Sequence, residues 1–247
     1  MNGYLLRFLR GLVCCVLFVE TAGAQDLAND SLLHSLSLSY PVKLYYSAIG
    51  ENAHIYNGYE YRTPDRNIKG SPYFLTDALV PANIYYDESY YPEVPVQYDQ
   101  VRDLVVIYRL DQNFKISLIP QKLNSFSLKN HEFIRISQDS AGGINLATGY
   151  YDRVYAGKST VLVRRKKYVH EVTEYTSTVL AYEEDYHYYV LFDNQYVEVK
   201  NKGSVLSLFE SKKSEIKSWL RKNKLKFKTD FEKTLIAAAA YYDQLTS

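Results

Sequence analysis

Histidine is the side chain in this sequence best suited to acid–base or metal chemistry, because its pKa lies near neutral pH. No two histidines stand four residues apart on a helical pattern or in the spacing of a zinc site. His170 belongs to the run HEVTE, and His187 follows an acidic run at 183–185. A metal or acid–base site that joins these segments across neighbouring strands is one interpretation, and a solvated polar face is the other. The five histidines are His34, His54, His131, His170 and His187.

The sequence carries no signature of an activated nucleophile or of a phosphate-binding loop. It contains neither a G-x-S-x-G motif nor a glycine-rich phosphate loop. Two carboxylates that meet only in space remain compatible with glycoside hydrolysis. The acidic run at 183–185, however, reads more simply as an exposed turn between strands. We therefore assign no catalytic residue, no metal ligand and no cofactor.

The densest aromatic stretch, NIYYDESYYPEVPVQYD at residues 83–99, predicts a hairpin. Residues 87–89 would form a three-residue loop, which places Tyr86 opposite Tyr90. Because side chains alternate between the two faces of a strand, every second residue then faces the core. The core-facing set is Ile84, Tyr86, Tyr90, Val94, Val96 and Tyr98.

The same register places Tyr85 opposite Tyr91 on the solvent side, beside Glu93 and Gln97. Two exposed rings flanked by hydrogen-bonding groups form a surface on which a glycan or a partner's apolar side chain can stack. Tyr85, Tyr91, Glu93 and Gln97 are therefore the candidate binding residues. The alternative is a cross-strand aromatic pair that only stabilises the hairpin, by roughly 0.2–1 kcal/mol.

A basic segment at residues 212–228 starts at Lys212, ends at Lys228 and holds eight Lys or Arg against one acid, Glu215. Such a segment can contact an anionic surface, such as lipopolysaccharide or phospholipid head groups. The alternative is a solvated helix face balanced by the acidic residues of 171–185. The partners that this chain predicts are thus an envelope protein, a glycan or a lipid.

Turn residues recur between runs rich in Val, Ile, Thr, Tyr and Phe across residues 51–203, which predicts an antiparallel sheet of roughly eight to eleven strands. Long helical periods are missing between these runs, which argues against parallel β-α-β units. The predicted fold class is α+β, a curled antiparallel β-meander with C-terminal helices packed on it. The expected turns are Asn57-Gly58, 87–89, 111–113, 129–130, 139–143 and 193–194.

Helical spacing of apolar residues is found at both ends of the chain. Residues 25–50 are compatible with an N-terminal helical segment that Pro41 interrupts. Residues 204–247 predict C-terminal helices, with Thr229 and Glu232 forming a capping box. One apolar stripe is expected to lie across the sheet. The stripe consists of Phe231, Leu235, Ala238, Ala239 and Tyr242.

Residues 1–24 have the pattern of a signal peptide. Arg7 and Arg10 are positive, LVCCVLFV is the apolar region, and AGA precedes Gln25. We therefore predict cleavage after Ala24 and export to the periplasm, the outer membrane or beyond.

Cleavage at this position would change both the charge and the thiol content of the chain. Removal of Arg7, Arg10 and Glu20 lowers Lys+Arg from 29 to 27 and Asp+Glu from 28 to 27, so the formal net charge becomes zero. Both cysteines lie in the removed segment, so no disulfide would stabilise the exported chain. Export and zero net charge together argue against nucleic acid as a partner.

Four stretches combine turn residues with aromatic residues. They are YNGYEY…IKGSPYF (56–74), YYDESYYPEVPVQYD (85–99), TGYYDRVYAGK (148–158) and KNKLKFKTDFEKTLIAAAAYYDQL (222–245). These stretches resemble a group of exported proteins of Gram-negative bacteria with no established activity. The resemblance covers nearly all of the chain after residue 24, implies export and transfers no functional residue.

Two functions are compatible with these patterns. The first is a non-enzymatic cell-envelope protein that binds a ligand or partner on its sheet. The second is a hydrolase that acts on an envelope or extracellular polymer. A pocket that joins His170 or His187 to two carboxylates would favour the hydrolase, whereas an apolar groove or exposed aromatic patch would favour binding.

Overall fold

The computed structural model of the chain describes residues 54–109, 114–138, 146–174 and 177–246. All of them fall in the unit of the chain that begins at Pro41. Four predicted features lie outside the described residues: the signal peptide (1–24), the helical segment (25–50) and the turns at 111–113 and 139–143.

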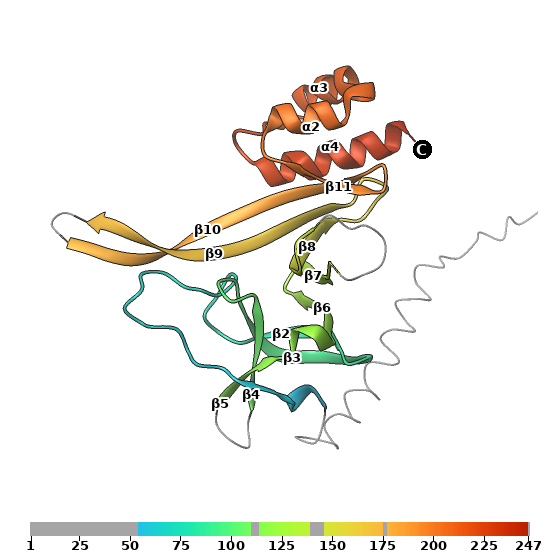
Figure 1. Cartoon of the computed structure of the whole chain (residues 1–247). Helices are drawn as coiled ribbons and strands as arrows, with labels where there is room; N and C mark the ends of the chain where they lie inside the picture. Colours follow the sequence, from blue (N-terminus) through green and yellow to red (C-terminus); the bar gives the residue numbers. More distant parts are fainter. Residues whose placement is uncertain (1–53, 110–113, 139–145, 175–176, 247) are drawn as a thin grey trace, which may run out of the picture. The chain divides into compact units, whose positions relative to one another are not determined.

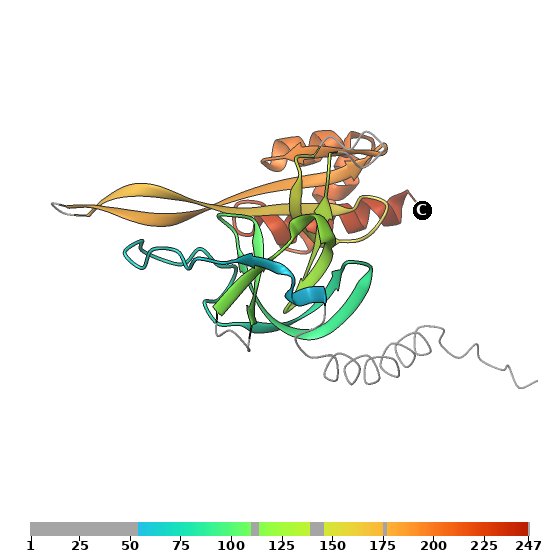
Figure 2. The same cartoon turned by 60° about the horizontal axis from the view of Figure 1, so that its bottom comes forward.

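In the described part of the chain, eleven strands form one open antiparallel sheet (Figures 1 and 2). This sheet and its accompanying helices agree with the predicted α+β class. The order across the sheet is β1-β5-β4-β3-β2-β6-β7-β8-β9-β10-β11. The strands are β1 (Gly58–Glu60), β2 (Val80–Tyr86), β3 (Ser89–Asp99), β4 (Leu104–Arg109), β5 (Phe114–Leu118), β6 (Leu123–Leu128), β7 (His131–Ile136), β8 (Gly149–Tyr155), β9 (Val161–Glu174), β10 (Ser177–Phe192) and β11 (Gln195–Val199).

Most strands pair with their neighbours in sequence, but β1 pairs with β5 and β2 with β6. The second pairing forces the sheet to curl. Three strands lie between β5 and β6, a separation of about 19 Å in a flat sheet with strands ~4.8 Å apart. Only residues 119–122 connect the two strands, and they reach at most about 17 Å when fully extended. A 3₁₀ turn at Pro120–Lys122 shortens the connection further.

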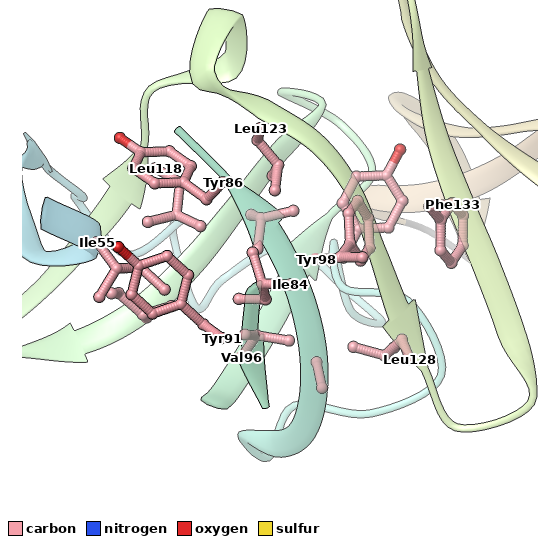
Figure 3. Packing of buried hydrophobic residues seen from close by; sticks show 14 of the residues in the cluster. Ile55, Ile84, Tyr86, Tyr91, Val96, Tyr98, Leu118, Leu123, Leu128 and Phe133 are labelled. Atoms are coloured by element: carbon pink, nitrogen blue, oxygen red, sulfur yellow. The ribbon is translucent and has the colours of Figure 1, made fainter. Parts of the chain in front are cut away.

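The curl closes around an aromatic core that Figure 3 shows from close by. Phe126 and Phe133 stack with ring centres 4.8 Å apart, and Tyr98 meets both at 5.3 and 5.0 Å. The hydroxyl of Tyr98 donates to Asp103 Oδ1 at 2.7 Å, so its polar end is satisfied although the side chain is buried. Tyrosine therefore serves as a core residue in the first half of the sheet.

The hairpin between β2 and β3 differs by one residue from the predicted register. Asp87 and Glu88 both have positive φ angles, 50° and 62°, so the turn has two residues instead of three. Tyr85 therefore faces Tyr90, and Ile84 faces Tyr91. A one-residue slip moves side chains to the opposite face. The predicted faces of Tyr90 and Tyr91 are wrong: Tyr90 is 45 % exposed, and Tyr91 is buried.

Gly58 is a strand residue, so the predicted hairpin turn at Asn57-Gly58 is wrong. It pairs with Leu118 across β1 and β5. A Cβ at this position would collide with the backbone carbonyl of Ser117. The glycine is needed here because two strands approach each other closely. The Asn-Gly pattern alone does not distinguish this role of glycine from its role in a turn. The turns predicted at 129–130 and 193–194 are present between β6 and β7 and between β10 and β11.

Strands β9 and β10 continue together beyond the rest of the sheet (Figures 1 and 2). Pairing of β8 with β9 ends at Val163, and pairing of β11 with β10 begins at Tyr188. The remaining residues form a two-stranded arm. The acidic residues 183–185 lie within this arm opposite residues 166–168, so their interpretation as a turn is wrong. Two of their cross-strand neighbours are lysines, which offset the acidic charge in the strand.

Three helices pack against the β9–β11 end of the sheet (Figure 1). The contact buries Val161, Val190 and Val199 of the sheet against Leu235 and Ala238, as the apolar stripe predicts. Among the described residues, no helix combines the length and apolarity needed to cross a membrane. The helices are α2 (Lys202–Leu208), α3 (Lys213–Lys222) and α4 (Phe231–Leu245).

The last helix is fixed at its N-terminus by polar contacts. Asp230, not Thr229, is the N-cap, and its carboxylate accepts from the backbone N–H of Lys233 at 2.9 Å. Glu232 accepts from Arg165 of β9 at 2.8 Å instead of completing the predicted capping box. Arg165 is buried and also donates to Asp152 of β8 at 2.7 Å, so a buried cation joins sheet and helix.

Candidate functional site

The structure separates the four predicted binding residues. Tyr85 is 41 % exposed on the outer face of the sheet, and Glu93 is exposed where a register shift interrupts the β2–β3 pairing. Tyr91 is buried with Ile84 in the core, where Figure 3 shows both. Gln97 is also buried, but it lies outside the hydrophobic cluster that contains Tyr91. An exposed tyrosine pair exists nevertheless, since Tyr90 stands opposite Tyr85.

Gln97 lines a polar pocket of about 370 Å³ between the sheet and the loop that joins β1 to β2. Its amide contacts the carbonyl of Asp77, and its oxygen accepts from Lys115 Nζ at 2.6 Å. Burial lowers the pKa of Lys115, because the charged amine is partly removed from water. These bonds tie the loop to the sheet, which gives Gln97 a structural role.

His187 is joined to two carboxylates. Its Nδ1 lies 2.7 Å from Glu198 Oε1, and its Nε2 lies 3.0 Å from Asp185 Oδ1. The pKa of the ring is raised, chiefly by the hydrogen bond to Glu198 and also by the hydrogen bond to Asp185 and the negative charge of that carboxylate. Both nitrogens therefore face carboxylates and neither is free to accept a proton from a substrate. The adjacent pocket, about 410 Å³, is lined by no Ser, Thr or Cys among the described residues.

The other arm histidine makes a separate contact. His170 Nε2 lies 3.2 Å from Glu183 Oε2, so His170 and His187 each pair with their own carboxylates. No group of three or more His, Cys, Asp or Glu among the described residues is arranged to hold a metal ion. The cross-strand site that would join the two histidine segments is thus not formed.

A pocket of about 560 Å³ lies on the C-terminal helices, and we call it the basic pocket. It is built by α2, α3 and the turn that joins α3 to α4. No carboxylate is among the described residues that line it. Six lining residues are cations, and four are apolar. The cations are Lys202, Lys217, Arg221, Lys224, Lys226 and Lys228, and the apolar residues are Leu206, Leu220, Leu225 and Phe227.

The end of α3 positions the pocket wall. The backbone N–H of Leu225 donates to the carbonyl of Leu220 at 2.9 Å, and that of Lys224 donates to Arg221 at 3.1 Å. These two bonds form a Schellman motif, in which Lys224 adopts a left-handed φ of 58°. This motif usually brings its two flanking apolar residues into contact. Here those residues are Leu220 and Leu225, which both line the basic pocket.

The charges of the basic pocket are not neutralised. Within the described part of the chain, none of its six cations forms an ion pair, and all six are exposed. At the start of the basic segment, by contrast, Lys212 lies 3.9 Å from Glu215 and Lys213 lies 2.7 Å from Glu210. The second half of the segment therefore carries the uncompensated charge.

The acidic residues of the arm pair elsewhere. Glu183 contacts His170, and Asp185 contacts His187. Glu184 lies 4.0 Å from Lys167. None of these acids lines the basic pocket. The interpretation of residues 212–228 as a face balanced by residues 171–185 is therefore not supported for the pocket cations.

The signal that located this site in the sequence is the density of lysine after residue 211. The apolar floor has no such signal, because Leu206 comes from α2 and looks like an ordinary core leucine. No protein-family model matches the chain, and comparison with curated proteins and with solved structures finds no match.

Proposed function

We propose that this chain is an exported, non-enzymatic protein of the cell envelope that binds an anionic lipid surface through its C-terminal helices. The observation that carries the proposal is the basic pocket, where six exposed cations without carboxylate partners surround an apolar floor. The proposed binding surface is formed by α2, α3 and the following turn. The tyrosine pattern of the sequence instead predicts a binding surface on the sheet.

The energetics favour such a contact. A Lys or Arg near an anionic membrane surface contributes roughly 1 kcal/mol, and the effect decays over about 10 Å at moderate ionic strength. Six cations on one face are enough for reversible adsorption. Zero net charge outside the predicted signal peptide keeps the attraction local to this face instead of spreading it over the molecule.

The predicted signal peptide and the resemblance to exported Gram-negative proteins support the envelope location. The hydrolase alternative requires a histidine or carboxylate poised to act on substrate. The only described histidine with two carboxylate neighbours is His187, and both of its nitrogens are occupied. This geometry favours a structural ion triad, and binding is the better-supported function.

Co-sedimentation with lipid vesicles tests the proposal. The protein should pellet with vesicles that contain phosphatidylglycerol, should stay in the supernatant with pure phosphatidylcholine, and should be released by salt. The triple variant Lys224→Gln/Lys226→Gln/Lys228→Gln should weaken binding at least tenfold.

The matched control is Lys200→Gln/Lys212→Gln/Lys213→Gln, which removes the same charge from lysines that already pair with carboxylates. The control should bind clearly better than the pocket variant. An equal loss of binding in both triple variants would mean that the attraction depends only on net charge and not on the basic pocket. Binding to neutral vesicles would also contradict the proposal.

A further inference from the structure

The apolar floor of the basic pocket is not needed for adsorption to a charged surface. Leu206 and Leu220 are buried, whereas Leu225 and Phe227 are half-buried and line the open space. Adsorption through head groups would engage only the lysines and arginines. The floor therefore calls for an occupant that also has an apolar part.

Apolar and basic residues alternate in the turn after α3. From Lys224 to Lys228 every apolar side chain is flanked on both sides by a lysine. An apolar group that contacts Leu225 or Phe227 is therefore within one residue of a cation. This pattern matches a molecule that carries its negative charge at one end of an apolar chain.

Three kinds of occupant can be compared by whether they contact the cations of the pocket, its apolar floor or both. A free phosphate ion would pair with lysines and leave the floor in contact with water. A neutral lipid would cover the floor and leave six cations without counter-charges. An acyl chain with a phosphate head group satisfies both. The pocket volume, about 560 Å³, is in the range of sites that enclose small ligands.

We propose that the basic pocket captures the acyl chain of a single anionic lipid, so that the protein takes up individual phosphate-headed lipid molecules from the surface to which it adsorbs. This inference rests on the proposed function, because adsorption delivers the lipid to the pocket. It adds a defined occupant and a stoichiometry of one lipid for each chain.

Titration with monoacyl phosphatidylglycerol below its micelle concentration tests the inference. Calorimetry should give one site, and affinity should rise roughly fourfold for each added methylene until the pocket is full. Inorganic phosphate and glycerol phosphate should bind far more weakly than the acylated probe. Affinity that does not depend on chain length would overturn the inference.

Variants of the floor give the second test. Leu225→Ser/Phe227→Ser should abolish the dependence on chain length while adsorption to phosphatidylglycerol vesicles persists. Leu180→Ser is the control, because Leu180 is an exposed leucine on the arm that does not line the pocket. If the serine pair lowers the melting temperature strongly, Leu225→Trp replaces it, since a larger side chain fills the space without exposing a polar floor. Wild-type affinity for the acyl probe in a folded floor variant would refute the inference.

The two proposals fail in different ways. Vesicle binding with normal salt dependence but no dependence on chain length leaves the proposed function intact and removes the lipid pocket. Capture of the monomeric probe without preference for anionic vesicles would support the lipid pocket and contradict the proposed adsorption.

The variant Lys224→Gly provides an internal check, because glycine adopts the left-handed φ of this position more readily and should preserve the fold while removing one pocket cation.

Discussion

Tyr90 and Tyr91 are neighbours in sequence, yet only one of them is accessible to a partner. Tyr91 packs beside Ile84 in the core, whereas Tyr90 lies opposite Tyr85 on the outer face. We expect Tyr91→Ala to lower the free energy of unfolding by about 3–5 kcal/mol, as truncation of a buried aromatic does. Tyr85→Ala and Tyr90→Ala should each cost under about 1 kcal/mol. Urea denaturation measures these free energies. A larger loss for Tyr90→Ala than for Tyr91→Ala would contradict the two-residue turn and support the predicted three-residue turn.

His187 should make stability depend on pH. Glu198 and Asp185 raise the pKa of the ring, so the charged ring stabilises the folded state below the unfolded pKa of about 6.5. This stability is lost as the pH rises through the higher folded pKa. The pKa of Glu198 is lowered, chiefly by His187 and also by Lys200, so its contribution is present above about pH 4.3 and lost in acid.

The corresponding variant is His187→Gln, which cannot become charged. Its melting temperature should fall below that of the wild type at about pH 5.5, where both the ring and Glu198 are ionised. The gap should narrow as the pH rises through the folded pKa of the ring, because the wild-type ring then loses its proton. A gap of constant size across this range would mean that His187 acts through packing alone.

At the scale of the elements, α4 should depend on its buried stripe. Leu235 is fully buried against the sheet, so Leu235→Asp places an unpaired charge in an apolar contact and should cost several kcal/mol. Lys233→Asp is the control, because the same carboxylate is exposed there and lies in the first turn, where the helix dipole favours it. Thermal melts of the two variants should differ by many degrees, and equal melts would show that α4 contributes little to the fold.

The types of most elements could be predicted because local chemistry decides them. Asp193-Asn194 and Lys129 accept positive φ angles between apolar runs, and the stripe around Leu235 has helical spacing. The errors arose where one local pattern fits two structures. Gly58 permits a turn and also close strand contact. The residues at 183–185 look like a turn until the lysines opposite them are known.

Long-range features could not be predicted. The pairing of β2 with β6 depends on how far the sheet curls, which no local pattern encodes. The candidate site divides in the same way: its lysines are evident in the sequence, whereas its floor requires Leu206 of α2 to meet Leu225 after α3. The buried position of Gln97 likewise depends on Lys115 and on a distant loop.

At the scale of the whole molecule, the first two dozen residues predict a processing event. Intact mass of the protein from the envelope fraction should correspond to a chain that starts at Gln25. The measurement needs no ligand and uses the full-length precursor as its control, produced without export. A mass that includes residues 1–24, or an added lipid at Cys15, would contradict the predicted cleavage after Ala24.

The way β1 and β2 find their partners has a consequence for the order of folding. Gly58 must meet Leu118, and Tyr85 must meet Ser125, so the first half of the sheet closes large loops before its core is buried. The β9–β10 hairpin instead pairs two strands that follow each other directly in the chain. Local contacts form faster, so we expect this hairpin to gain protection before β1 and β2 in pulsed hydrogen exchange during refolding. During export from the N-terminus, the first half of the sheet would emerge before this hairpin, so the part that folds slowly would be exposed first.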